Sequence, residues 1–428
     1  MEQRAASQRA AFWPEPPQDL EGMGIPESLV NDLALRHIYL KGTTSIRTMV
    51  ESLRLPPLVA EALFAGFRKQ QWLDVKGMIG NDYSFSLTAQ GRAVATERFQ
   101  LCQYAGPAPV SIRDYDRATR AQAPKVKVDR SRLRGLLSDL VLTDRLLDQL
   151  GPAIISQDSI FLYGPTGNGK TSLAERLLRV YDDVIVMPYA VEVDGQIIIL
   201  YDPVVHQKVE VEAEDLDPRW LVAKRPCITT GGELVATMLE LRFDELSGNY
   251  AAPLQMKANN GIFVIDDFGR QVISPRELLN RWIVPLDRRV DYLTLRYGIK
   301  FQIPFEVLVV FSTNLDPNEL ADEAFLRRIQ NKIYLEAVGP AVFDEIFRKF
   351  TETRKLPAEP GSAETLRALC MERAGNLRAA YAIDVTKIVI SICEYEQQPA
   401  RITRRELERA VDLYFTRPVA PDATAEGQ

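Results

Sequence analysis

Apolar positions follow a helical period near the start of the chain and then alternate. Apolar residues at three- to four-residue spacing predict a helix through Leu29 and Leu40, a second over 43–53, and a third that opens at Pro56-Pro57. The stretch from Trp72 to Arg92 then alternates apolar and polar residues around a turn at Gly80-Asn81-Asp82, which indicates a β-hairpin. Residues 27–103 are therefore expected to fold as three helices followed by a hairpin.

A different pattern covers residues 136–339, where helical segments alternate with short apolar runs. This alternation is typical of a parallel sheet covered by helices, so we expect an α/β fold class. Only helical patterns remain over residues 340–416, which predicts an all-helical C-terminal region. Alternating apolar runs around Asp194-Gly195 also predict a β-hairpin inserted near 184–213.

Three segments carry no such periodicity. Residues 1–26 contain four prolines and are expected to be a disordered tail, and residues 417–428 a second tail. Residues 104–135 combine prolines with a run of basic residues and are interpreted as a linker. The chain is thus expected to consist of an N-terminal domain, a basic linker, an α/β core and a helical region.

Composition supports several domains and excludes some classes of protein. A chain of 428 residues exceeds the size of one ordinary core, and 46% hydrophobic with 26% charged residues is usual for a soluble globular protein. No apolar run approaches the roughly 20 residues of a membrane span, and the N-terminus lacks the apolar segment of a secretory signal. The four cysteines and two histidines lack metal-ligand spacing, so we expect a reduced, cytoplasmic location and no zinc site.

The net charge of −6 is unevenly distributed. Residues 1–112 carry 11 Lys/Arg against 11 Asp/Glu, whereas residues 113–134 carry 8 against 3. A short basic block of this kind is more often a solvated linker than a nucleic-acid contact. Both interpretations remain open at this point, with the linker preferred.

The strongest motif lies between an apolar strand and a helix at residues 159–178. Its sequence fits GxxxxGK[ST], in which glycines let backbone N–H groups surround phosphates, the lysine neutralises the β- and γ-phosphates, and the hydroxyl ligates Mg²⁺. ATP and Mg²⁺ are the ligands this motif predicts. The expected nucleotide-binding residues are Gly164, Pro165, Thr166, Gly167, Asn168, Gly169, Lys170, Thr171 and Ser172.

Hydrolysis also needs acidic side chains, and a second apolar run ends in two of them. The run at 261–265 is followed by Asp266 and Asp267. Asp266 is expected to help hold Mg²⁺, and Asp267 to polarise the attacking water. A third apolar run, 307–312, ends in Thr313-Asn314, so the Asn314 side chain is expected to face the γ-phosphate.

This ordered set of motifs, followed by an all-helical region, resembles the AAA+ ATPases over about residues 136–416. The resemblance implies that Asn314 is the sensor 1 residue and that Arg378 is the sensor 2 arginine of a helical lid, 340–416. It also implies an arginine finger, for which Arg328 is the first candidate and Arg327 its rival. The family usually has Glu where this chain has Asp267, which puts the hydrolysis rate in question but not nucleotide binding.

Two finer resemblances concern the branch and the N-terminal domain. The approach to Asp266 is similar to that in MoxR-type proteins and enhancer-binding activators, which implies a pore loop near Leu246–Pro253 with Tyr250 as its aromatic contact. The activators' GAFTGA sequence is absent, which argues against promoter opening. Residues 27–103 resemble a winged-helix domain.

Three functions fit these motifs. The preferred one is a homo-oligomeric, hexameric AAA+ ring whose Mg²⁺-dependent ATP hydrolysis remodels a protein or protein assembly. The alternatives are a DNA-associated motor or regulator that binds duplex through the winged helix, and a nucleotide-dependent assembly switch. DNA is not favoured because the third predicted helix has only Arg68 and Lys69 at its end, against Glu61.

Overall fold

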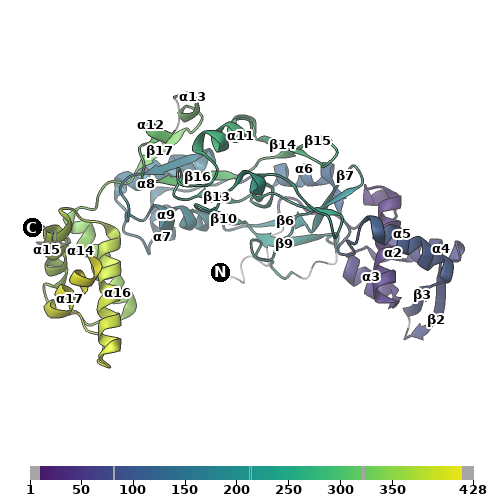
Figure 1. Cartoon of the computed structure of the whole chain (residues 1–428), viewed down its shortest axis with the longest axis horizontal. Helices are drawn as coiled ribbons and strands as arrows, with labels where there is room; N and C mark the ends of the chain where they lie inside the picture. The colour runs from purple at the N-terminus through teal and green to yellow at the C-terminus, as the bar shows by residue number, and fades with distance from the viewer. Residues whose placement is uncertain (1–9, 81, 212, 214, 321–322, 417–428) are drawn as a thin grey trace, which may run out of the picture.

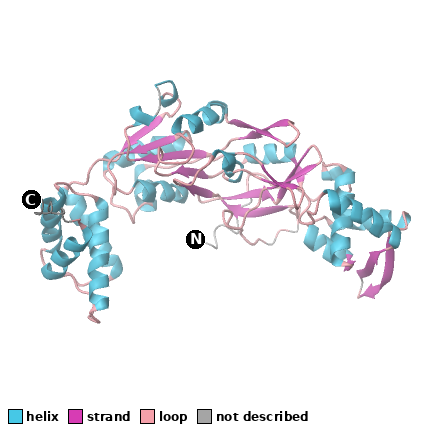
Figure 2. Ribbon diagram, viewed as in Figure 1, coloured by secondary structure: helices cyan, strands magenta, loops and turns pink. Residues whose placement is uncertain are grey.

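The structure, a computed structural model, describes residues 10–416 apart from residues 81, 212, 214, 321 and 322. Figure 1 shows an elongated arrangement, with an N-terminal helical unit and a C-terminal helical unit at opposite ends and sheets between them. Figure 2 shows that strands gather in the middle of the molecule and in one small sheet of the N-terminal unit. Five clusters of buried apolar side chains underlie this arrangement in the described part of the chain.

The N-terminal unit has the three helices and the hairpin that the hydrophobic pattern predicts. Its antiparallel sheet has the order β1-β3-β2. Leu33, Phe67 and Phe85 are buried in its core. Of the predicted turn, Asn81 lies outside the described residues. The elements are the short 3₁₀ turn η1 Glu21–Met23, α2 Glu27–Lys41, β1 Thr43–Ser45, α3 Ile46–Leu53, α4 Pro57–Lys69, β2 Leu73–Ile79, β3 Asp82–Leu87 and α5 Ala89–Leu101.

The segment expected to be a disordered tail is packed over residues 10–26. Phe12 lies against Trp220, with ring centroids 5.4 Å apart, and Trp13 Nε1 donates to Asp215 Oδ1 at 3.1 Å. Met23 is fully buried among the N-terminal helices. The prolines suggested disorder, but the large apolar residues between them bury enough surface to hold the segment in place. Residues 1–9 lie outside the described part.

Residues 104–135, interpreted from sequence as a basic linker, contain regular secondary structure. It contains β4 Val110–Ser111, α6 Ile112–Ala121 and α7 Arg130–Leu136. Tyr115 is buried, and the side chain of Gln122 pairs with the backbone of Val186 as a strand would, at 2.8 and 2.7 Å. Most of this segment is therefore part of the folded core rather than a tether.

A β-rich unit, formed by α6, β4, β6–β9, β11 and β12, is larger than the single predicted hairpin. The expected turn is present, since Asp194 and Gly195 have positive φ angles of 50° and 75° between β7 and β8. Its two sheets have the orders β11-β12-β8-β7-β4 and β6-β9. The strands are β6 Val184–Pro188, β7 Ala190–Val193, β8 Gln196–Ile199, β9 Trp220–Lys224, β11 Arg242–Asp244 and β12 Asn249–Ala251.

Tyr250 does not occupy the exposed loop expected of a pore contact. It lies on β12, is 2% exposed, and its hydroxyl accepts a hydrogen bond from the Arg296 N–H at 3.0 Å. The assignment of Tyr250 as an exposed aromatic contact is therefore wrong, because the ring is needed in the core of the β-rich unit. An exposed aromatic nearby is Tyr297, 83% exposed between β14 and β15.

The α/β core is a five-stranded parallel sheet of order β10-β13-β16-β5-β17. Side chains of one face pack with α7, α8 and α9, and those of the other with α11. The remaining core elements are α8 Asp144–Ser156, β5 Ile160–Tyr163, α9 Lys170–Arg176, η2 Leu177–Val180, β10 Cys227–Thr230, η3 Ala236–Leu239, α10 Leu254–Lys257, β13 Ile262–Ile265, α11 Pro275–Arg288, β14 Val290–Thr294, β15 Lys300–Pro304, β16 Leu308–Thr313, α12 Pro317–Leu320, α13 Glu323–Leu326 and β17 Asn331–Tyr334.

The strand order brings the predicted motifs to one edge. β16 lies between β5, which precedes the phosphate-loop motif, and β13, which precedes Asp266. The carboxyl ends of these three parallel strands therefore meet, and the crevice beyond such ends is where open α/β sheets bind ligands.

The C-terminal region is helical, as predicted, and has its own core. Phe343, Leu366 and Val385 are fully buried in it. No helix within the described residues is long and apolar enough to cross a membrane. The four helices are α14 Pro340–Arg354, α15 Ser362–Ala374, α16 Ala379–Tyr395 and α17 Arg404–Tyr414.

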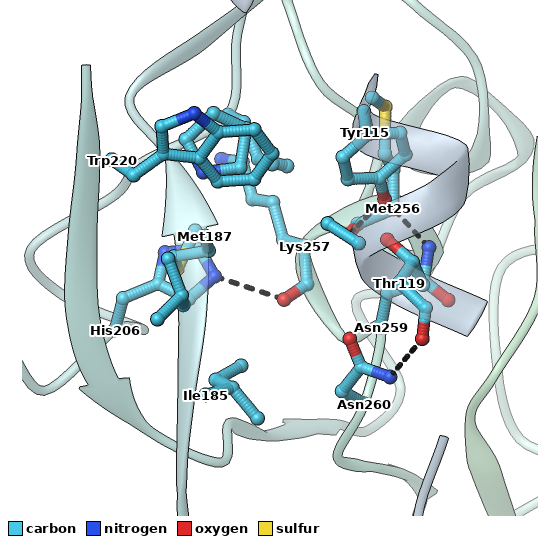
Figure 3. A pocket seen from close by; sticks show the side chains of 14 residues that line it. Tyr115, Thr119, Ile185, Met187, His206, Trp220, Met256, Lys257, Asn259 and Asn260 are labelled. Carbon is cyan, nitrogen blue, oxygen red and sulfur yellow. Dashed lines mark hydrogen bonds between the residues drawn. The ribbon is translucent and has the colours of Figure 1, made fainter. Parts of the chain in front are cut away.

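A small cavity of about 20 Å³ lies inside the β-rich unit, between α6 and the strands β6 and β9 (Figure 3). His206 Nδ1 accepts from the Asp202 N–H at 3.0 Å, so its proton is on Nε2, which donates to the Lys257 carbonyl at 2.9 Å. Asn259 donates to the Tyr115 hydroxyl at 2.7 Å. The cavity holds at most one water, and these polar side chains are already paired, so it is a packing feature rather than a ligand site.

Candidate functional site

The loop between β5 and α9 has the backbone that a phosphate-binding loop requires. Gly164 has φ +139°, and a Cβ there would lie 2.3 Å from the Leu335 carbonyl oxygen, so only glycine fits. Gly169 has φ +82° at the N-cap of α9. Both glycines of the motif are thus explained by local conformation, and the loop leads directly into the helix N-terminus.

The interior of this loop offers donors for an anion. The backbone N–H groups of Gly167 to Thr171 donate no hydrogen bond to any other described residue. Lys170 is 8% exposed, and its Nζ donates to the carbonyls of Gly164 and Pro165, both at 2.9 Å. Burial lowers the pKa of Lys170, and the nearby Asp266 and Asp267 carboxylates oppose that shift. A ring of free N–H groups around a buried lysine suits a polyphosphate.

Thr171 and Asp266 are in direct contact. The Thr171 hydroxyl, on the first turn of α9, donates to Asp266 Oδ2 at 2.7 Å, although the two residues are 95 positions apart. Asp266 follows β13 and Thr171 follows the phosphate loop, so the contact joins the two motifs across β16. Two oxygen ligands at this spacing suit Mg²⁺, which is usually held by one or two protein side chains together with substrate phosphates.

Asp267 occupies a tight turn beside this contact. It is exposed and has φ +47°, a left-handed conformation that is uncommon outside glycine. Gln271 closes the turn, because its Nε2 donates to the Asp266 carbonyl and its Oε1 accepts from the Gly269 N–H, both at 2.8 Å. The exposed carboxylate is therefore presented by a backbone that is held on both sides.

Two asparagines leave buried acceptors at the same edge. Asn314, directly after β16, donates weakly to Thr166 Oγ1 at 3.4 Å, and Asn168 donates to the Glu336 carbonyl at 3.0 Å. The Oδ1 atom of each is buried without a partner among the described residues. A buried unpaired acceptor is costly in a finished core, so both atoms fit a site that a ligand or water completes.

The C-terminal helices contact the phosphate loop. The Ala380 N–H, in the first turn of α16, donates to the Gly167 carbonyl at 2.8 Å. Arg378 is the N-cap of α16, its Cδ would lie 3.6 Å from a Cβ built on Gly167, and its guanidinium lies 5.5 Å from the Tyr381 ring centroid. Arg378, predicted from sequence, is thus beside the loop.

The arginine-finger candidates lie elsewhere. Arg327 pairs with Glu323 of α13 at 2.7 Å, and Arg328 Nε donates to Asp287 Oδ2 at 2.9 Å near the end of α11.

Ser172, the last predicted loop residue, is the third residue of α9. The structure therefore brings together the loop, Asp266, Asp267, Asn314 and Arg378. Arg327 and Arg328 instead contact acidic side chains of α13 and α11.

One family model matches the C-terminal part of the chain, and solved structures match the chain at low sequence identity. Residues 339–413 match the model of a domain of unknown function, DUF8689, and no curated protein matches the chain. A mutant form of Thermotoga maritima RuvB is 14% identical, with 63% of this chain and 69% of that chain covered and a TM-score of 0.38. NtrX from Brucella abortus is 14% identical, with 68% and 60% covered and a TM-score of 0.40. The functional argument therefore depends on the site itself.

Sequence reasoning missed the residues that support the loop from outside. Gln271, Leu335 and Ala380 contact the motif residues through a side-chain amide, a backbone carbonyl and a backbone N–H respectively. Contacts made by backbone atoms do not depend on residue type, so the sequence does not indicate them. A glutamine five positions after Asp266 could have been noticed as a polar residue folding back on a turn, but no periodicity identifies it.

Proposed function

We propose that this protein is a Mg²⁺-dependent ATPase of the AAA+ type. The observation that carries the proposal is the Thr171 to Asp266 hydrogen bond of 2.7 Å beneath a loop whose inner N–H groups are free of partners among the described residues. A glycine-rich turn with a chance lysine would not need a half-buried acidic partner that follows another strand. The direct test is Mg²⁺-dependent release of phosphate from ATP by the purified chain.

Each residue has a distinct task in this proposal. The N–H groups of residues 167–171 and the Lys170 ammonium hold the phosphates, while Thr171 and Asp266 hold Mg²⁺, whose charge offsets that of the phosphate oxygens. Asp267 accepts a proton from the attacking water, and Asn314 orients that water or the γ-phosphate from the adjacent strand. Arg378 reaches the nucleotide from the C-terminal helices, so binding is linked to the position of that lid.

We further propose that the active form is a homo-oligomeric ring, hexameric by family resemblance, in which Arg328 acts on the neighbouring subunit's nucleotide. Arg328→Ala is expected to keep ATP affinity but lose about 10³-fold or more in turnover, the range known for arginine fingers. Arg327→Ala is the matched comparison, since the neighbouring Arg327 pairs with Glu323, four positions before it. Turnover and light scattering over a concentration series give the measurement.

The ring proposal also predicts that specific activity rises with protein concentration as subunits assemble. If Arg328→Ala and Arg327→Ala lose turnover equally, the assignment of either one as the arginine finger is not supported. A rate per subunit that stays constant in a sample shown to be monomeric would contradict the ring itself.

For the N-terminal unit we propose a winged-helix adaptor that contacts protein rather than DNA. The order helix, strand, two helices and hairpin supports the fold assignment. The unit is joined firmly to the β-rich unit, because the buried Arg219 donates to the carbonyls of Met23 and Pro109 at 2.8 and 3.2 Å while pairing with Asp217. A unit held in this way would move together with the ATPase core.

Weak DNA binding is the corresponding expectation. In the basic block, five arginines pair with aspartates, which leaves few charges for phosphate contacts. We expect full-length protein to bind duplex DNA no more tightly than about 10⁻⁴ M at physiological salt, without sequence preference. Fluorescence anisotropy over a salt series tests this. The pairs are Arg117–Asp114, Arg120–Asp116, Arg130–Asp148, Arg132–Asp182 and Arg134–Asp144.

Submicromolar, sequence-selective DNA binding would instead favour the DNA-motor alternative. Between protein remodelling and a nucleotide-dependent assembly switch, we favour remodelling. Tyr297, exposed between β14 and β15, is an aromatic side chain available for a protein substrate. Capture experiments with ATP-trapped protein from lysate distinguish the two, because a switch would recover only further copies of the chain.

A further inference from the structure

The turn that carries Asp266 and Asp267 is closed by one side chain. Gln271 is 9% exposed, and its amide spans the turn from the Asp266 carbonyl to the Gly269 N–H, with both hydrogen bonds 2.8 Å long. One group thus satisfies an acceptor and a donor that the short turn cannot pair within itself. A side-chain amide can do both through two separate atoms, since it has a carbonyl oxygen and an NH₂.

The backbone inside this turn needs such support. Asp267 holds φ +47°, and Gly269 holds φ +104° where a Cβ would lie 2.6 Å from Leu320 Cδ2. A left-handed aspartate is retained only where the surroundings determine its conformation. The Arg270 N–H also donates to the Asp267 carbonyl at 3.0 Å, which tightens the turn around the carboxylate.

The other side of the turn is anchored to β16. The Phe268 N–H donates to the Ser312 carbonyl and the Thr313 hydroxyl donates to the Phe268 carbonyl, both at 2.7 Å. Because Asn314 follows Thr313 directly, the strand that carries Asn314 and the turn that carries Asp267 are joined. Gln271 completes this frame through its own two hydrogen bonds, to Asp266 and Gly269.

We propose that Gln271 is a positioning residue that fixes the Asp266–Gly269 turn and thereby sets the placement of the Asp267 carboxylate for hydrolysis. The proposal rests on the proposed ATPase function and goes beyond it, since Gln271 belongs to none of the motifs read from the sequence. The Asp267 side chain has a single methylene, so the place of its carboxylate follows closely from its backbone, and the Gln271 amide holds that backbone in its left-handed form.

The test compares full-length wild type with Gln271→Met, which keeps side-chain length and removes both hydrogen bonds. We expect kcat to fall about 10- to 100-fold, the usual loss when a residue supporting a metal-site ligand is replaced. The dissociation constant of ATP should stay within about twofold, because residues 164–171 hold the phosphates and the side-chain hydrogen bonds of Gln271 go to Asp266 and Gly269 instead. Gln271→Glu, which still accepts from Gly269 but cannot donate to Asp266, should also lower kcat and serves if the Met variant fails to fold.

Gln157→Met is the matched control. Gln157 has the same 9% exposure in the same α/β core and likewise accepts one hydrogen bond, from the Tyr181 hydroxyl at 2.8 Å, and donates another, to the Ile154 carbonyl. Its replacement should lower thermal stability while leaving kcat within about twofold. Loss of kcat in proportion to lost stability in both variants would overturn the positioning role.

A double-mutant cycle decides whether Gln271 acts through Asp267. In single-turnover assays, Gln271→Met should cause no further loss in a chain that already carries Asp267→Asn. Two outcomes would overturn the inference while the ATPase assignment stands. In one, the double variant loses the product of the two single-variant fold-losses in hydrolysis rate; in the other, Gln271→Met alone leaves kcat unchanged. If the wild type hydrolyses no ATP, the proposed function fails, and the inference fails with it.

Discussion

Replacing Asp267 by Asn is expected to leave a protein that binds ATP and Mg²⁺ but hydrolyses ATP about 10²- to 10⁴-fold more slowly, the usual contribution of a general base. The amide cannot accept the water proton, yet it preserves the size of the side chain and its left-handed turn, where Asn is tolerated as well as Asp. Binding should survive because the Thr171–Asp266 contact does not involve Asp267. Phosphate release and ATP titration on the same sample measure the two properties separately.

Asp148→Asn is a suitable control for loss of a carboxylate in the same core. Asp148 lies on α8 and pairs with Arg130, and neither residue is assigned a role at the site, so its replacement should leave ATP binding and the chemical step intact. The two variants are compared in single-turnover assays at one fixed protein concentration. Wild-type turnover in Asp267→Asn would show that another group takes the proton.

Replacing Lys170 by Ala is expected to weaken ATP binding by about 2–5 kcal/mol, the cost of removing one partner of a buried charge pair. At the upper end of this range, binding is lost at ordinary nucleotide concentrations. The ammonium is held by the Gly164 and Pro165 carbonyls, so its removal takes a positive charge away from the loop. Isothermal titration with ATP and Mg²⁺ provides the measurement.

Lys332→Ala controls for the loss of a lysine from the same sheet. Lys332 is on β17, beside β5, and its Nζ donates to the Ile329 carbonyl at 2.6 Å. Its replacement should leave ATP affinity within about twofold. Equal affinity in Lys170→Ala and wild type would show that the loop does not bind the phosphates.

The elements of the site that are contiguous in sequence could be predicted. A strand, a glycine-rich loop and a helix identify Lys170 and Thr171, and a buried strand ending in two aspartates identifies Asp266 and Asp267. A parallel sheet places the carboxyl ends of all its strands at one edge, but the order that puts β16 between β5 and β13 appears only in the structure. The parallel sheet and the helical C-terminal region were likewise predictable, since each repeats one pattern over many residues.

The features that could not be predicted from the sequence depend on contacts between segments that are far apart in the chain. Proline content suggested a free tail, yet Phe12 and Trp13 are held against the β-rich unit. Tyr250 resembled a surface residue because of its Gly-Asn turn, whereas its ring completes a core formed by strands far apart in the chain. Residue type does not reveal such burial when the partner strands are unknown.

The measurement that tests the central claim most directly is phosphate release from ATP by the purified full-length chain, with Mg²⁺ and with a chelator. The account predicts steady release with Mg²⁺, little with the chelator, and strong loss in both Lys170→Ala and Asp267→Asn, of which only Lys170→Ala also loses ATP binding. A wild-type chain that neither binds nor hydrolyses ATP in the presence of Mg²⁺, at concentrations where subunits assemble, would contradict it.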